Sequence, residues 1–135
     1  MSLDITRRER EGVILLDLKG RITIGDEASA FREAFEKVAV QPEPRLILNM
    51  LDVDYVDSTG LGAMVMCSMR LKNANGVAKL VNVNRRNIEL MVMTKIDSIF
   101  EVFTDETDAV NSFFPGREIK PFDILSFVRQ LGEET

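Results

Sequence analysis

The sequence contains no histidine, and this absence excludes several kinds of site. Ser-His-Asp and Cys-His nucleophile systems cannot form within this chain alone, and neither can the common histidine-containing zinc sites. Cysteine is almost absent too. The single Cys67 rules out an internal disulfide, and its apolar neighbours predict a small core side chain in a reducing compartment. If a serine of this chain reacts, the base must come from another protein.

Positive charge is scarce as well. The 17 lysine and arginine residues are scattered among 22 carboxylates, and the net charge is -5, so nucleic acid is not an expected partner. No apolar run approaches the roughly 20 residues that cross a bilayer, and the charged start MSLDITRRERE lacks the apolar centre of a signal peptide. We therefore expect a cytoplasmic protein that does not insert into membranes. No nucleotide-binding Gly-x-x-x-x-Gly-Lys-(Ser/Thr) loop is present, and we expect no cofactor.

A chain of 135 residues fits one domain. From Asp26 onward, short apolar stretches alternate with stretches of helical periodicity, which is typical of a mostly parallel sheet with helices packed against it. The predicted strands are an N-terminal hairpin of residues 5–8 and 13–18, a central strand at 46–50 buried on both faces, a strand at 77–83, and a short edge strand at 98–103. The predicted helices begin at Asp26, Ser58, Arg85 and about Thr104.

These elements predict an α/β domain over residues 1–114, with a mostly parallel mixed sheet, an N-terminal hairpin strand and about four helices. Residues 115–135 form an extension whose apolar residues recur every three positions; they are Phe122, Leu125, Val128 and Leu131. This spacing predicts an amphipathic helix that packs on its own domain or makes a homodimer or partner contact. A place on a membrane surface is the weakest alternative, because its polar side carries few cations.

The predicted helix that begins at Ser58 has one apolar side at helical spacing. That side is expected to face the sheet and consists of Leu61, Met64, Val65, Ser68 and Leu71. Ala63 and Met66 lie away from it. Together with Gly62 they form either an adaptable apolar contact for a partner or unremarkable packing.

The start of this helix lies in the segment VDYVDSTGLG, residues 53–62, which has two interpretations. In the first, Ser58 simply caps the helix, a contribution of about 1 kcal/mol. Capping does not explain the neighbouring hydroxyl of Thr59, nor Gly60 and Gly62 in the first turn, where each glycine costs up to about 1 kcal/mol relative to alanine. In the second, Ser58 is displayed for another protein to modify, and the two glycines open the approach.

Two enzymatic interpretations of the same segment are weaker. Asp52 and Asp54 after an apolar strand fit the Asp-x-Asp-x-(Thr/Val) opening of haloacid dehalogenase-like phosphatases. Such enzymes also need a later lysine and a further acidic cluster for magnesium, and no paired acidic cluster follows here. An aspartic protease motif has one Ser or Thr between Asp and Gly, whereas this chain has two.

The hexapeptide Asp57-Ser58-Thr59-Gly60-Leu61-Gly62 follows an apolar strand and opens an apolar helix. In this it resembles the STAS domain, specifically the anti-sigma factor antagonists of bacterial partner-switching systems. The resemblance covers roughly residues 3–114. It includes weaker blocks at 18–22, 79–83 and 99–103.

The resemblance implies a regulatory protein that is not an enzyme. It makes Ser58 a phosphorylation site, with Asp57 as its acidic neighbour and Thr59 as the adjacent hydroxyl. Thr23 stands where many members have an aspartate near that serine. The implied partners are an anti-sigma factor that is also a serine kinase, which binds the unphosphorylated form, and a PP2C-type phosphatase. The alternative within the same fold is a scaffold without phosphorylation, as a subunit of a lipid transporter or of a stress-sensing assembly.

Overall fold

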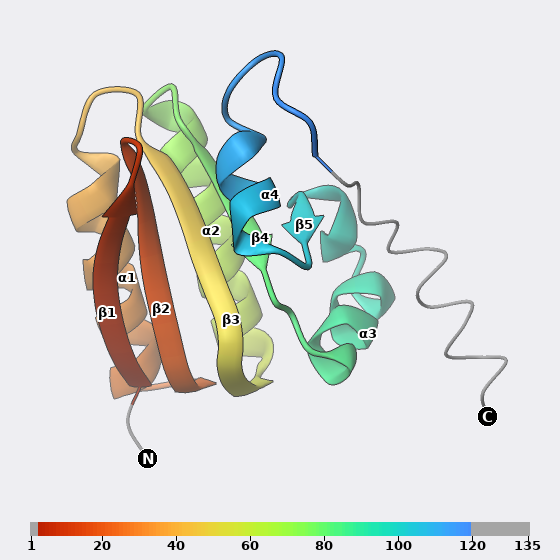
Figure 1. Ribbon diagram of the computed structural model, residues 1–135. Helices are drawn as coiled ribbons and strands as arrows, with labels where there is room; N and C mark the ends of the chain where they lie inside the picture. Colours follow the sequence, from red (N-terminus) through yellow and green to blue (C-terminus); the bar gives the residue numbers. More distant parts are fainter. Residues whose placement is uncertain (1–2, 120–135) are drawn as a thin grey trace, which may run out of the picture.

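The structure, a computed structural model, describes residues 3–119 as a five-stranded sheet with helices on both faces (Figure 1). The strands lie side by side in chain order. The β1–β2 pair is antiparallel and the other three pairs are parallel. The strands are β1 (Leu3–Arg10), β2 (Val13–Ile22), β3 (Arg45–Val56), β4 (Val77–Val81) and β5 (Val102–Phe103). The prediction of a mostly parallel mixed sheet with an N-terminal hairpin is confirmed.

The helices form two layers around the sheet. Helices α1 and α2 cover one face, α4 lies on the other, and α3 lies beyond β4, below β5 in the view of Figure 1. Their bounds are α1 (Asp26–Ala39), α2 (Ser58–Asn73), α3 (Arg85–Met93) and α4 (Glu106–Asn111), with a short 3-10 turn, η1 (Ile96–Ser98), after α3. Within the described range, no helix has the length and apolar character needed to cross a bilayer.

The hairpin turn between β1 and β2 is made by Glu11 and Gly12, which both adopt positive φ angles of 53° and 82°. A two-residue turn with positive φ at both positions matches the twist of the flanking strands, and glycine supplies the second position without strain. This tight turn puts β1 at the edge of the sheet.

The two faces of the sheet bury two apolar clusters. The larger one lies between the sheet and α1, α2 and α3, and the smaller one lies under α4. The central strand β3 contributes to both, and Leu46, Ile47 and Leu48 are all completely buried. This confirms that the central strand is buried on both faces, as its unbroken apolar sequence predicts.

The predicted short edge strand at 98–103 is present, but it is shorter than predicted. Only the two residues of β5 pair with β4, and the chain before them forms the η1 turn. β4 also ends earlier than predicted, at Val81 rather than at residue 83, because Asn82 adopts a positive φ of 61° and the chain turns toward α3. Only Leu80 and Val81, the last two residues of β4, pair with β5.

The predicted C-terminal extension falls mostly on residues 120–135, which lie outside the described residues. Arg117, just beyond the predicted boundary at residue 114, forms an ion pair with Glu11 of the hairpin turn at 3.0 Å. The same guanidinium lies 4.2 Å from the ring centroid of Phe114. The domain boundary and the amphipathic helix stay predictions.

A polar network crosses the α4 side of the sheet and ties α4 to the edge strand. Arg8 of β1 makes two hydrogen bonds to the carboxylate of Asp17 on β2, at 2.6 and 2.9 Å, and a bond of 2.6 Å to Glu106 of α4. Arg10 binds Glu106 at 2.6 Å, and the side-chain amide of Asn49 donates to Asp17 at 2.8 Å. The hydrogen bonds from Arg8 hold the pKa values of Asp17 and Glu106 below their usual range, against the opposing effect of burial.

We predict that Arg8→Met lowers the free energy of unfolding at pH 7 by about 1–2 kcal/mol, because both carboxylates lose charge-assisted hydrogen bonds. Depressed pKa values stabilise the fold at neutral pH, and this stabilisation is lost as the pH falls below about 5. Urea unfolding at pH 7 and pH 4 should therefore show a smaller difference between the variant and the wild type at pH 4. Arg7→Met, on the opposite side of the same strand, is the matched control, and an equal loss from it would contradict the assignment.

Candidate functional site

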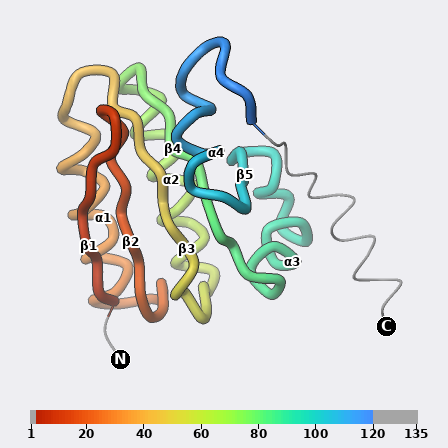
Figure 2. Tube along the Cα trace, in the orientation of Figure 1, coloured from red at the N-terminus to blue at the C-terminus, as the bar shows by residue number. Residues whose placement is uncertain are grey.

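The parallel strands β2 and β3 end side by side, where Ile22 pairs with Val56. Each strand is followed by a helix, so the starts of α1 and α2 lie together at this end of the sheet (Figure 2). Sites in α/β folds commonly lie at the carboxyl ends of parallel strands. The structure brings Thr23 and Ser58, which are 35 positions apart in the sequence, to this one end.

Asp57, and not Ser58, caps α2. Its carboxylate accepts a hydrogen bond from the backbone amide of Gly60 at 2.8 Å, in the geometry of an N-cap residue. The second carboxylate oxygen accepts from the amide of Ile24 at 3.0 Å. The interpretation of Ser58 as the cap is therefore wrong, because one carboxylate both caps α2 and holds the loop between β2 and α1.

The electrostatics of Asp57 follow from these bonds. Burial disfavours its charged form, but the amide hydrogen bonds from Gly60, Ile24 and Thr59 outweigh this effect and hold its pKa below the usual range. The carboxylate is thus ionised at neutral pH. It lies at the helix end where the positive pole of the dipole favours an anion.

Ser58 is the first residue of α2 and is exposed. Among the contacts of residues 3–119, its hydroxyl makes no hydrogen bond. Thr59, which follows it, is partly buried. An exposed hydroxyl that is not used for capping is available to an enzyme that approaches from solvent.

The two glycines of the motif have different surroundings. A side chain on Gly60 would place its Cβ 1.9 Å from the carbonyl oxygen of Ile22 and 2.9 Å from Val56, so Gly60 is needed for the close packing of α2 on the end of β2. Gly60 is buried and does not open the surface, contrary to the prediction from the sequence. Gly62 is exposed and has open space around it, so its missing side chain leaves room beside Ser58.

The loop between β2 and α1 forms the second wall of the site. Thr23 is partly buried, and its carbonyl accepts from the amide of Ala28 at 3.0 Å as α1 begins. Ile24 is 72% exposed, although it is a large apolar residue. Sequence reasoning missed Ile24. The sequence nevertheless indicated it, because Ile24, between Thr23 and Gly25, fits neither the apolar pattern of β2 nor that of α1.

The outer side of α2 carries exposed methionines. Met66 is 51% exposed and Met69 is 58% exposed, which agrees with the prediction that Met66 lies away from the sheet. Ala63 is completely buried, so its predicted place on the outer side was wrong. Cys67 is buried as predicted, and burial raises the pKa of its thiol to about 12, which makes it unreactive at neutral pH.

The remaining acidic residues of the motif lie within β3 rather than after it. Asp52 and Asp54 are exposed, and Asp52 pairs in register with Lys19 of β2. In the part of the chain that the structure describes, no three His, Cys, Asp or Glu side chains are grouped closely enough to hold a metal ion.

Comparisons with known proteins agree on one family. The family model of the STAS domain matches residues 4–109. The anti-sigma-B factor antagonist of Bacillus subtilis is 30% identical over 102 residues, which cover 76% of this chain and 92% of that protein. The anti-sigma-F factor antagonist RsfB of Mycobacterium tuberculosis is 28% identical over 118 residues, covering 86% of this chain and 93% of that one. An anti-sigma factor antagonist from Mycobacterium paratuberculosis has a similar solved structure, with a TM-score of 0.70, 20% identity, and coverage of 82% and 92%.

We predict that alanine substitutions at the two glycines act with opposite sign. Gly60→Ala should lower the free energy of unfolding by about 2–3 kcal/mol, because the added methyl group collides with a backbone carbonyl that cannot move independently of β2. Gly62→Ala should raise it by about 0.5–1 kcal/mol, because the site is open and alanine favours the helix. Denaturant titration of both variants tests the pair. Equal effects would contradict the close approach at Gly60.

We predict that Asp57→Ala lowers the free energy of unfolding by about 1–2 kcal/mol through loss of the cap. Because the same carboxylate holds the amide of Ile24, hydrogen exchange should also accelerate at Ile24, outside α2. Asp57→Asn is the matched control, since its side-chain oxygen retains one acceptor for the amide of Gly60. Faster exchange confined to α2 in the alanine variant would show that the link to the loop is unimportant.

Proposed function

Because the chain belongs to the STAS domain family, we propose that it is an anti-sigma factor antagonist whose binding to its anti-sigma factor is switched off by phosphorylation of Ser58. One observation carries the proposal. The Ser58 hydroxyl is exposed at the first residue of α2 because Asp57 has taken over the capping. The names of the relatives support the class of partner.

Phosphorylation at this position is compatible with the fold. It adds about 1.5–2 negative charges and three acceptor oxygens at Ser58. The first backbone amides of a helix and the positive end of its dipole favour an anion there, and the first turn of α2 contains no acidic side chain. The modified protein therefore keeps its fold.

Phosphorylation of Ser58 leaves the fold intact but should weaken the binding of a partner. The surface around Ser58 combines the apolar side chain of Ile24 with the open space at Gly62, and a close-fitting partner would cover both. A phosphate at Ser58 would then be buried beside the carboxylate of Asp57 without a compensating charge. Burial of an unpaired charge is costly, so the partner is released while the antagonist stays folded.

In the phosphoryl transfer, the chain is the substrate and not the enzyme. The Ser58 oxygen attacks the γ-phosphorus of ATP, the bond between that phosphorus and the β–γ bridging oxygen breaks, and ADP leaves. The kinase supplies magnesium and the base that accepts the hydroxyl proton. A PP2C-type phosphatase reverses the reaction by hydrolysis. The chain itself contributes the exposed hydroxyl and the space left by Gly62.

Several finer features belong to the same proposal. The anti-sigma factor is also the serine kinase, and both proteins act in the cytoplasm. Thr23 stands in place of the aspartate of many relatives, so the kinase meets a neutral side chain on that wall of the site. The proposal also includes a homodimer through the C-terminal extension, which light scattering of chains with and without residues 115–135 would test.

We predict that the anti-sigma factor kinase that binds this chain phosphorylates the wild type on Ser58. Ser58→Ala should take up no phosphate and keep its binding to the kinase. Ser58→Asp should bind about tenfold more weakly or worse, because it places a fixed charge in the contact. Mass spectrometry locates the phosphate, and calorimetry measures the dissociation constants.

Thr59→Val is the matched control, because it removes the adjacent hydroxyl and leaves Ser58 in place. Phosphate on Thr59 instead of Ser58 would contradict the proposed site. Binding that neither substitution at Ser58 changes would favour a scaffold without phosphorylation. Hydrolysis of a generic phosphate ester that disappears in Asp52→Asn would restore the phosphatase interpretation.

A further inference from the structure

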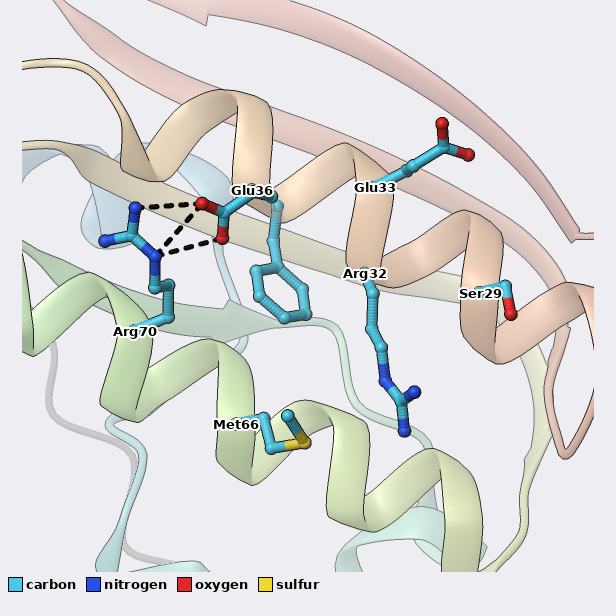
Figure 3. Close-up of a pocket in the computed structure, with 7 residues that line it drawn as sticks. Ser29, Arg32, Glu33, Glu36, Met66 and Arg70 are labelled. Carbon is cyan, nitrogen blue, oxygen red and sulfur yellow. Dashed lines mark hydrogen bonds and ion pairs between the residues drawn. The ribbon is translucent and has the colours of Figure 1, made fainter.

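A groove of about 470 Å³ runs between α1 and α2 (Figure 3). The ring of Phe35 and the side chain of Met66 provide apolar surface in it, and the ion pair between Glu36 and Arg70, at 2.9 Å, bridges the two helices at one end. Phe35 is buried, whereas Met66 is half exposed. The volume lies within the range of sites that accept side chains or small molecules.

The groove continues the surface around Ser58. Ser58, Gly62, Met66 and Arg70 are spaced four residues apart, so they follow one ridge of α2. The first three are exposed. Eight residues separate Ser58 from Met66, which corresponds to about 12 Å along the helix. A partner that covers Ser58 therefore needs to extend only two helical turns to reach the groove.

The two arginines in the groove differ in whether a carboxylate pairs with them. Arg70 is neutralised by three hydrogen bonds to Glu36, at 2.9 to 3.2 Å. Arg32 is exposed, and among residues 3–119 no carboxylate forms an ion pair with it. Figure 3 shows Arg32 extending from α1 toward α2, while Glu33 points away from the groove. The lining thus contains two cations and two carboxylates, but Arg32 is the charge that reaches toward α2 without an ion pair, whereas the side chain of Glu33 is directed elsewhere.

We infer that this groove is a second docking site for the anti-sigma factor, and that it accepts an apolar side chain with a neighbouring carboxylate from that partner. The inference rests on the proposed function. The apolar side chain packs on Met66 and Phe35, and the carboxylate pairs with Arg32. Arg32 is then a residue that selects the partner, and it acts at a distance from the phosphorylated hydroxyl.

The test compares dissociation constants for the purified anti-sigma factor kinase and unphosphorylated full-length chains. Arg32→Glu should weaken binding about tenfold, because it replaces an attraction by a repulsion. Arg32→Lys should stay within about threefold of the wild type, because it keeps the charge. Met66→Ala should weaken binding about fivefold through lost apolar contact. The effect of Arg32→Glu should shrink when sodium chloride is raised from about 0.05 M to about 0.5 M.

Two exposed residues elsewhere provide matched controls. Lys19→Glu makes the same charge change on β2, and Met93→Ala makes the same truncation at the end of α3, where Met93 is 80% exposed. Both should bind like the wild type. In phosphorylation assays, Arg32→Glu should raise KM and leave kcat unchanged, because Arg32 does not touch the reacting atoms.

The outcomes separate this inference from the proposed function. If Ser58→Asp weakens binding while Arg32→Glu and Met66→Ala do not, the second docking site is wrong and the switch stands. If the groove variants change self-association in light scattering but not kinase binding, a second copy of the chain occupies the groove and the inference fails. If the kinase binds no form of the chain, both proposals fail.

Discussion

The carboxylate of Asp57 is the group on which the site depends. It accepts amide hydrogen bonds from Gly60 at the start of α2 and from Ile24 in the loop before α1, at 2.8 and 3.0 Å. One side chain thus fixes two segments that are distant in sequence. Because Asp57 also caps α2, the hydroxyl of Ser58 is not needed to cap the helix and can react with another molecule.

In the proposed switch, folding and regulation depend on different residues. Gly60 serves the fold, since the backbone of Ile22 leaves no room for a side chain there. Gly62 and Ser58 are both exposed and belong to the proposed contact surface. A negative charge at Ser58 meets the favourable end of the α2 dipole, and the same charge is unfavourable in a close contact with a partner. The proposed switch would need no conformational change in this chain.

The groove between α1 and α2 gives the proposed contact a second part with different chemistry. Around Ser58 the contact would be controlled by phosphorylation, and around Arg32 and Met66 it would depend on the match of charge and apolar surface. This arrangement would let related antagonists in one cell distinguish among similar anti-sigma factors.

The sequence by itself determined the order of strands and helices, the parallel sheet and the motif around Ser58, because apolar periodicity and local propensity report local geometry. It failed at the bounds of the two-residue strand β5, because the chain before this strand forms the η1 turn and does not pair with β4. It also treated Ser58 as the cap of α2, and it predicted that Gly60 and Gly62 both open the approach to Ser58. Only the tertiary structure decided these points and formed the groove, because most of them depend on contacts between segments that are distant in the chain. Ile24 binds Asp57, a side chain on Gly60 would collide with Ile22, and Arg70 binds Glu36.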